Sequence, residues 1–243
     1  MQKIPVIINS RNRVSCLKLM VDWLRKDPMA DIIILDNKST YEPLLDYYKT
    51  LDCQIEYLGK NCGHHALYTW NKHHDLNSRY FIYSDPDMIP KEDCPKDLIP
   101  HLLSIKKEHI LFNKVGAMLE TTDLPDHYKF KQEVIELHSN YCHNRLKNSF
   151  VAYVDTTFAL YDIERTAGSK PYIRNCLITD RPYVMRHLPW YEDSNNLTEE
   201  SMYYASTADA IFVDTNSRIK KVGLWTQKTR TMLEQPDGSP SYR

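Results

Sequence analysis

Glycine is scarce in this chain, with six in 243 residues, and none of the six belongs to a common phosphate-binding loop. The sequence has no Gly-x-Gly-x-x-Gly and no Gly-Lys-Ser/Thr, which disfavours a dinucleotide dehydrogenase and a P-loop enzyme. An excess of one charge is lacking as well, because 31 basic residues face 32 acidic ones, a net charge of −1. We therefore expect no nucleic acid partner.

Paired cysteine motifs and long apolar runs are also missing. The six cysteines contain no Cys-x-x-Cys and no zinc-knuckle spacing, so we interpret them as reduced, small hydrophobic residues of a cytoplasmic protein. The N-terminus shows no secretory signal, and no run is long enough to span a membrane. The cysteines are Cys16, Cys53, Cys62, Cys94, Cys142 and Cys176.

Short apolar runs alternate with amphipathic stretches through the first half of the chain. Each of four runs is followed by a connection long enough for a crossover helix, a pattern typical of a mainly parallel sheet flanked by helices. The sequence therefore predicts an α/β fold with one main domain, and 42% hydrophobic residues can supply its core. The predicted strands cover residues 5–8, 32–35, 53–58 and 80–83, and the predicted helices lie near 17–24, 44–48 and 64–75.

The fourth run ends in the sequence Asp85-Pro86-Asp87. Pro86 stiffens the link, so two carboxylates are held close together where a buried strand leaves its sheet. Close carboxylates repel unless a cation lies between them, and Mg²⁺ or Mn²⁺ combines such ligands with water and substrate phosphates. An ordinary turn with aspartate-to-backbone hydrogen bonds is the competing interpretation.

Polar residues also follow the first three runs. In open α/β sheets, ligands bind at the carboxyl ends of the strands, so these side chains are candidates for contacting a nucleotide. The alternatives are structural, namely a helix cap or a tight turn. The candidates are Asn9, Ser10, Arg11 and Asn12 after the first run, Asp36 after the second and Asn61 after the third.

Four histidines crowd the segment 64–75 without the i, i+4 spacing of a helical zinc site. We interpret His64, His65, His73 and His74 as surface or core residues.

Taken in order, these features resemble the GT-A fold glycosyltransferases that use nucleotide-diphospho-sugars, particularly glycosyltransferase family 2. The resemblance rests on the polar loop of residues 4–12, the Asp-Asn-x-Ser-Thr stretch at 36–40, the Asn-x-Gly turn at 61–63 and the Asp-x-Asp motif at 85–87. It covers about the first 120 residues. It implies a GT-A domain over residues 1–215, with a nucleotide-binding half up to about 120 and an acceptor half from 121, followed by a basic segment at 216–243.

The resemblance also implies a cofactor and roles for residues in the second half. Mn²⁺ or Mg²⁺ is expected on Asp85 and Asp87, with His187 as a third ligand and Asp85 also near the donor. Asp155, an acid inside an apolar stretch, is the first candidate for the catalytic base, and Asp193, in a late acidic pair, is the alternate. The family's Gly-Gly acceptor motif and its Gln-x-x-Arg-Trp are missing, which leaves the acceptor class open.

The function expected is transfer of a sugar from a nucleotide-diphosphate donor, a UDP-sugar, to a glycan or other hydroxyl acceptor, with inversion. Alternatives are a non-catalytic protein of the same fold that binds a nucleotide-sugar or carbohydrate, and a nucleotidyltransferase. The basic stretch 218–230 is read as a solvated tail, a lid over the pyrophosphate or a peripheral membrane contact.

Overall fold

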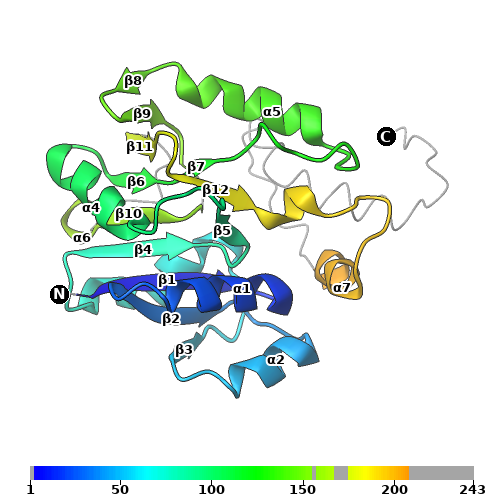
Figure 1. Cartoon of the computed structure of the whole chain (residues 1–243). Coiled ribbons are helices and arrows are strands. Elements are labelled where there is room, and N and C mark those ends of the chain that lie inside the picture. Colours follow the sequence, from blue (N-terminus) through cyan, green and yellow to red (C-terminus); the bar gives the residue numbers. More distant parts are fainter. Residues whose placement is uncertain (1–2, 155–156, 167–174, 208–243) are drawn as a thin grey trace, which may run out of the picture.

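Figure 1 shows the computed structural model, which describes residues 3–154, 157–166 and 175–207. Two sheets and the helices around them account for most of this part of the chain. The helices are α1 (Val14–Leu24), α2 (Glu42–Tyr48), α3 (Ala66–Trp70), α4 (Leu98–Glu108), α5 (Lys131–Ser139), α6 (Ile163–Thr166) and α7 (Glu199–Thr207).

Within the described residues, the larger sheet has nine strands in the order β3-β2-β1-β4-β10-β6-β11-β9-β8. The first four are parallel, whereas β10 runs antiparallel to both of its neighbours and β9 antiparallel to β11 and β8. The strands are β1 (Ile4–Ser10), β2 (Ala30–Asp36), β3 (Gln54–Tyr57), β4 (Tyr80–Ser84), β6 (Lys114–Gly116), β8 (Arg145–Leu146), β9 (Ser149–Ala152), β10 (Ala159–Asp162) and β11 (Cys176–Thr179).

A smaller sheet of three strands brings distant segments of the chain together at the candidate site. Its central strand β12 (Val184–His187) pairs antiparallel with β5 (Met88–Pro90) and parallel with β7 (Met118–Leu119). Because β5 follows directly on β4, this small sheet joins the middle of the large one to a segment about 100 residues later in the chain.

The middle of the larger sheet is covered on both faces, which explains why strands such as β1 and β4 are mostly apolar. Alternate residues of β1 point to opposite sides: Val6 and Ile8 pack in one hydrophobic cluster with residues of α1, α2 and α4, and Ile7 packs in another with α3. All three side chains are fully buried. The continuous apolar run is thus the sequence signature of a strand between two layers.

The predicted α/β class, a mixed sheet flanked by helices, is confirmed, and the first four strands are parallel as expected. The second half differs, because antiparallel β10 is inserted between β4 and β6. The helix expected at 64–75 is broken: α3 ends at Trp70, and the positive φ of 56° at the next residue, Asn71, takes the chain out of the helix. The basic segment 216–243 lies outside the described residues.

His73 is the buried member of the four histidines, with 1% of its surface exposed and its ring 5.6 Å from that of Phe81. Burial, with a smaller contribution from His74, lowers the pKa of His73 to about 4. In the unfolded chain His73 takes up a proton below about pH 6.5, whereas in the folded protein it does so only below about pH 4. The free energy of unfolding therefore decreases as the pH is lowered from about 6.5 to about 4.

Replacing His73 by leucine is expected to reduce this acid sensitivity. One such group contributes at most about 1.4 kcal/mol per pH unit to the free energy of unfolding. Urea unfolding at about pH 7 and about pH 5 measures the difference, with exposed His74→Leu as the matched control. An equal loss of stability in wild type and His73→Leu would show that His73 is not a source of the pH dependence.

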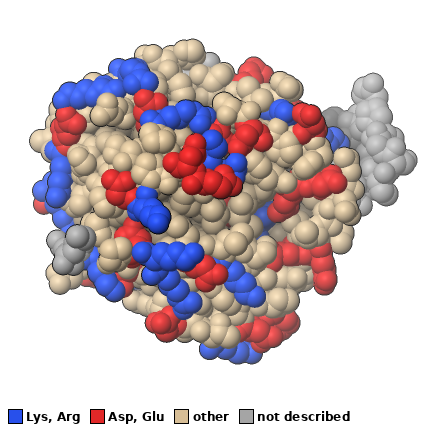
Figure 2. All heavy atoms as spheres, in the orientation of Figure 1, with Lys and Arg blue, Asp and Glu red and all other residues tan. Residues whose placement is uncertain are grey.

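The six cysteines form no disulfide. On the face shown in Figure 2, Lys and Arg lie among Asp and Glu instead of forming one basic field. Among the described helices, none combines the length and the apolar character needed to cross a membrane.

Candidate functional site

The Asp-x-Asp segment lies at the carboxyl end of β4, between the two sheets. Ile8 of β1 is paired with Ser84, the last residue of β4, so the loops that follow these two strands leave the sheet at the same edge. Asp87 is 7% exposed and precedes β5 directly, while Asp85 is half-buried. The sequence prediction that buried strand β4 delivers two carboxylates to a sheet edge is thereby met in the structure.

The small sheet brings His187 to this edge. In the β5–β12 ladder His187 is paired with Met88, and the backbone N–H of Leu188 donates to the carbonyl of Asp87 at 2.9 Å. As a result His187 Nε2 lies 3.5 Å from Asp87 Oδ1. Two residues 100 positions apart in the sequence are thus neighbours through backbone pairing.

Asp87 and His187 offer a carboxylate oxygen and an imidazole nitrogen, both of which are common ligands of divalent cations. Within the part of the chain that the structure describes, the buried atoms Asp87 Oδ1 and His187 Nδ1 have no hydrogen-bond partner. The 3.5 Å between Oδ1 and Nε2 allows both atoms to bind one ion, since such bonds are roughly 2.0–2.2 Å long. Among the described residues no three acidic, His or Cys side chains form a metal cluster, so Asp85 does not complete a ready-made set of three.

Arg13 is the cation that the structure places beside Asp87. Its guanidinium is almost fully buried, lies 3.2 Å from Glu192 Oε1 and stands 4.4 Å from the ring centre of Tyr204. Burial alone would raise the pKa of Asp87, but His187 and Arg13 outweigh it, so that pKa lies below its ordinary value. Asp87 is therefore ionised at neutral pH, as a metal ligand must be.

The loop after β1 is held by its own hydrogen bonds. Asn12 is buried, and its Oδ1 accepts from the backbone N–H of Thr40 at 2.7 Å and of Tyr41 at 3.1 Å. Its Nδ2 donates to Thr207 Oγ1 at 2.9 Å, and Arg11 Nη2 donates to the Thr207 carbonyl at 2.7 Å. These two nucleotide-contact candidates thus link the loop to the start of α2 and to α7.

Asp36, at the end of β2, also has structural partners. Its carboxylate accepts from the backbone N–H of Ser39 at 3.1 Å and lies 3.0 Å from the hydroxyl of Tyr48. The same hydroxyl lies 2.8 Å from Ser10 Oγ, so the ends of β1 and β2 are joined through one tyrosine of α2. Asp36 is only 3% exposed, and its role in binding a ribose or base stays a prediction.

The Asn-x-Gly turn reaches the same edge. The Gly63 carbonyl accepts from Asn9 Nδ2 at 3.4 Å and from Asn37 Nδ2 at 3.1 Å, and Asn37 Oδ1 accepts from the Cys62 N–H at 2.6 Å. Asn61 Oδ1 accepts from the N–H of Gly63 at 3.0 Å and closes the turn. All four segments that the sequence singled out therefore meet at the carboxyl ends of β1, β2 and β4.

The structure describes one of the two candidate bases. Asp155 lies outside the described residues. Asp193 is exposed, and its Oδ1 accepts from the backbone N–H of Asn195 at 2.9 Å, a turn-capping contact. The neighbouring Glu192 points the other way, toward Arg13 and toward Ser201 Oγ at 2.8 Å.

Aromatic rings line the other side of His187. The ring of Trp190 lies 4.8 Å from that of His187 and 5.1 Å from that of His138 in α5, in edge-on arrangements. Burial, with His187 as a second cause, lowers the pKa of His138 to about 4, so it is neutral near pH 7. Trp190 belongs to a small core with Tyr128 and Phe130, which fixes the segment before α5 beside the site.

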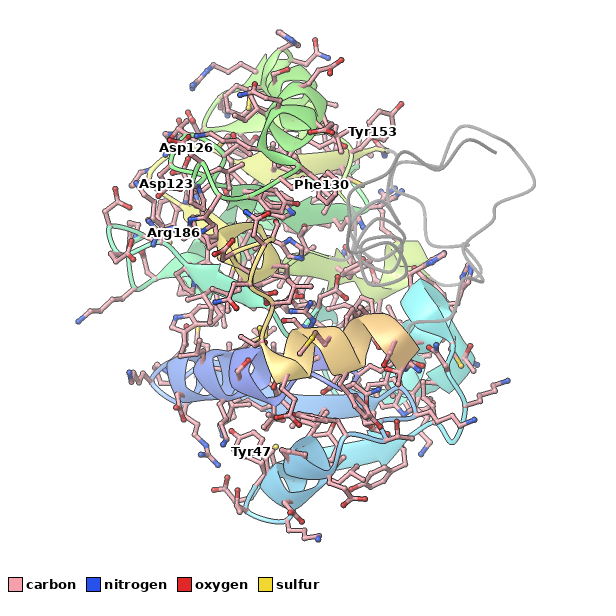
Figure 3. The ribbon with its side chains drawn as sticks, turned by 90° about the vertical axis from the view of Figure 1, so that its right-hand side faces the viewer. Tyr47, Asp123, Asp126, Phe130, Tyr153 and Arg186 are labelled. Carbon is pink, nitrogen blue, oxygen red and sulfur yellow. The ribbon has the colours of Figure 1, made fainter. Side chains whose placement is uncertain are left out.

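The strand that carries His187 is also fixed by ion pairs on its exposed side. Arg186 pairs with Glu92 and, at 2.5 Å, with Asp123, which accepts from the Tyr191 hydroxyl at 2.6 Å. Figure 3 shows Arg186 and Asp123 close together at this rim. Arg186 therefore holds the loop after β7 in place.

Two residues of the site were not predicted from the sequence: Arg13 and Glu200, whose carboxylate accepts from the backbone N–H of Val14 at 3.0 Å. Arg13 stood inside the polar loop, but nothing local marked it as buried. One feature could have pointed to Glu200: the start of helix α1 has no side-chain cap and no acid in its first turn. Such a helix needs a partner for its first N–H groups from elsewhere.

The sequence matches no protein-family model and no curated protein. Solved structures similar in fold include a mycobacterial protein, with 12% identity over 76% of this chain and 67% of that chain and a TM-score of 0.49. Another is glucosyl-3-phosphoglycerate synthase from Mycobacterium tuberculosis in complex with Mn²⁺, UDP and glucosyl-3-phosphoglycerate, with 14% identity, 67% of this chain, 57% of that chain and a TM-score of 0.42. This chain thus spans little more than half the length of that synthase. The likeness is one of fold alone.

Proposed function

We propose that this protein is a metal-dependent glycosyltransferase that transfers a sugar from a nucleotide-diphosphate donor, a UDP-sugar, to a hydroxyl acceptor. The observation that carries the proposal is the buried, ionised Asp87 beside His187 at the carboxyl end of β4, where strands β1 and β2 also end. A buried carboxylate oxygen and an imidazole nitrogen 3.5 Å apart are suited to hold Mn²⁺ or Mg²⁺.

In this proposal each residue of the edge has a distinct task. Asp87 Oδ1 and His187 Nε2 hold the metal, and the half-buried Asp85 contacts the metal or the donor's ribose. The bound ion supplies positive charge that stabilises the diphosphate as it leaves. The positive charge of Arg13 helps to keep Asp87 ionised.

The polar loops after β1, β2 and β3 are the parts of the protein that bind the donor. Asn9, Arg11 and Asn61 line the edge together with Ser10, Asn12 and Asp36, whose buried hydrogen bonds keep the loops in shape. Proton removal from the acceptor hydroxyl requires a carboxylate on the opposite side of the reacting carbon, and Asp155 and Asp193 are the two candidates.

A thermal shift panel of nucleotides and nucleotide-sugars, each with and without Mn²⁺, tests the proposal. A ligand that binds only the folded state raises the melting temperature, and UDP or a UDP-sugar with Mn²⁺ is expected to give the largest rise. Stabilisation by UDP-sugar without any hydrolysis or transfer would favour a non-catalytic binding protein. No stabilisation by any nucleotide diphosphate, with or without metal, would refute the proposed function.

A further inference from the structure

Helix α7 lies against the two loops that the donor is proposed to contact. In Figures 1 and 3 it is the orange helix beside α1. Its partners belong to the loop after β1, to the start of α1 and to residues just before α2, and the contacts bridge about 160 to 200 positions of the sequence.

The central contact is a carboxylate at the start of α1. Glu200 accepts hydrogen bonds from the backbone N–H groups of Val14 and Ser15, both at 3.0 Å, and from Ser15 Oγ at 2.5 Å. The residue at the N-cap position of α1 is Arg13, which gives no side-chain cap. Glu200 therefore satisfies the first N–H groups of a helix that cannot cap itself.

Further contacts hold the middle and the carboxyl end of α7. The Tyr203 hydroxyl lies 3.0 Å from the Thr40 carbonyl, and its ring centre is 4.9 Å from that of Tyr41. At the carboxyl end of the helix, Arg11 and Asn12 bind Thr207. Two residues proposed for donor binding thus have side chains engaged by α7.

The apolar contribution to this docking is small. In α7 only Ser201 and Ala205 are buried, and Met202 is 42% exposed. Apolar burial scales with area, and α1 buries five side chains, whereas Tyr203 and Tyr204 of α7 are only half-buried; we therefore expect α7 to detach at lower cost than a core helix such as α1.

We propose that α7 is a built-in latch, in which Glu200 occupies the anion-attracting start of α1 and must withdraw before a nucleotide diphosphate binds the loop after β1. The start of a helix favours negative charge, so carboxylate and diphosphate compete for the same N–H groups. The competition with a nucleotide rests on the proposed function, whereas the docking itself does not.

Glu200→Gln is the test variant, and exposed Glu199→Gln is its control, because it removes the same charge one residue away. Hydrogen exchange of the peptide covering the start of α1 comes first and needs no ligand. Exchange in Glu200→Gln is expected to be about tenfold faster than in wild type, with no change in Glu199→Gln. Unchanged exchange in Glu200→Gln would overturn the latch.

Titration calorimetry with UDP and Mn²⁺, and separately with inorganic pyrophosphate, tests the competition. Because the apparent Kd scales inversely with the fraction of open protein, Glu200→Gln is expected to bind both ligands roughly tenfold more tightly than wild type and Glu199→Gln. Equal or weaker binding by Glu200→Gln would overturn the latch. If no variant binds UDP but Glu200→Gln gains pyrophosphate affinity, the latch stands and the proposed glycosyltransferase function fails.

Discussion

Asp87→Asn is expected to lose metal-dependent UDP binding by about 100-fold or more, while the protein still folds. Substitutions of groups that merely support a metal ligand already cost roughly 10–100-fold in affinity, and Asp87 is proposed as the ligand itself. Asparagine keeps the shape of the side chain but not the charge that balances Arg13 and the cation. Titration calorimetry of UDP in the presence of Mn²⁺ measures the loss.

Asp93→Asn is the matched control, because Asp93 is an exposed acid a few residues later that pairs only with Lys91 at 3.3 Å in the described structure. It is expected to bind UDP as wild type does. A thermal melt of Asp87→Asn without ligand separates loss of binding from loss of fold. UDP affinity in Asp87→Asn equal to that of wild type would remove Asp87 from the metal site.

The second large effect concerns the catalytic base. Replacing it by asparagine is expected to lower kcat by ~10²-fold or more with little change in donor affinity, because general-base catalysis typically contributes that much. Asp155→Asn and Asp193→Asn are the two variants. Steady-state kinetics with the donor identified by the thermal shift panel, together with calorimetry of UDP, separates kcat from donor binding.

Each outcome of this pair has a clear meaning. A collapse in Asp155→Asn alone assigns the base to Asp155, and a collapse in Asp193→Asn alone assigns it to Asp193, whose carboxylate would then have to leave its contact with Asn195. If both variants keep near-native turnover, neither is the base. A product that keeps the donor's anomeric configuration would contradict a single displacement.

The fold could be predicted from the sequence where a local pattern decides the structure. Buried strands such as β1 and β4 are continuously apolar because both faces are covered, and each ends in polar residues. Parallel pairing then brings their ends to one edge, which is why the four motifs were found together. The antiparallel insertion of β10 was not predictable in this way, since strand order depends on contacts between distant segments.

Within the site, residue type alone could not separate ligand contacts from internal hydrogen bonds. Asn12 and Asp36 were expected to contact a nucleotide, and the structure shows that both have protein partners. Short polar side chains after a strand serve either purpose equally well. Arg13 and Glu200 were missed for a related reason, because burial of the one and capping by the other arise from packing of α7 about 190 residues away.

The central claim is that Asp87 and His187 bind a divalent cation together with a nucleotide diphosphate. Pulsed electron paramagnetic resonance of Mn²⁺ bound to the wild-type protein with UDP tests it most directly, because couplings to nearby nuclei report the ligands. We expect a nitrogen coupling from one imidazole, lost in His187→Gln, and phosphorus couplings from the diphosphate. A Mn²⁺ spectrum without nitrogen coupling, or one that UDP does not change, would contradict the account.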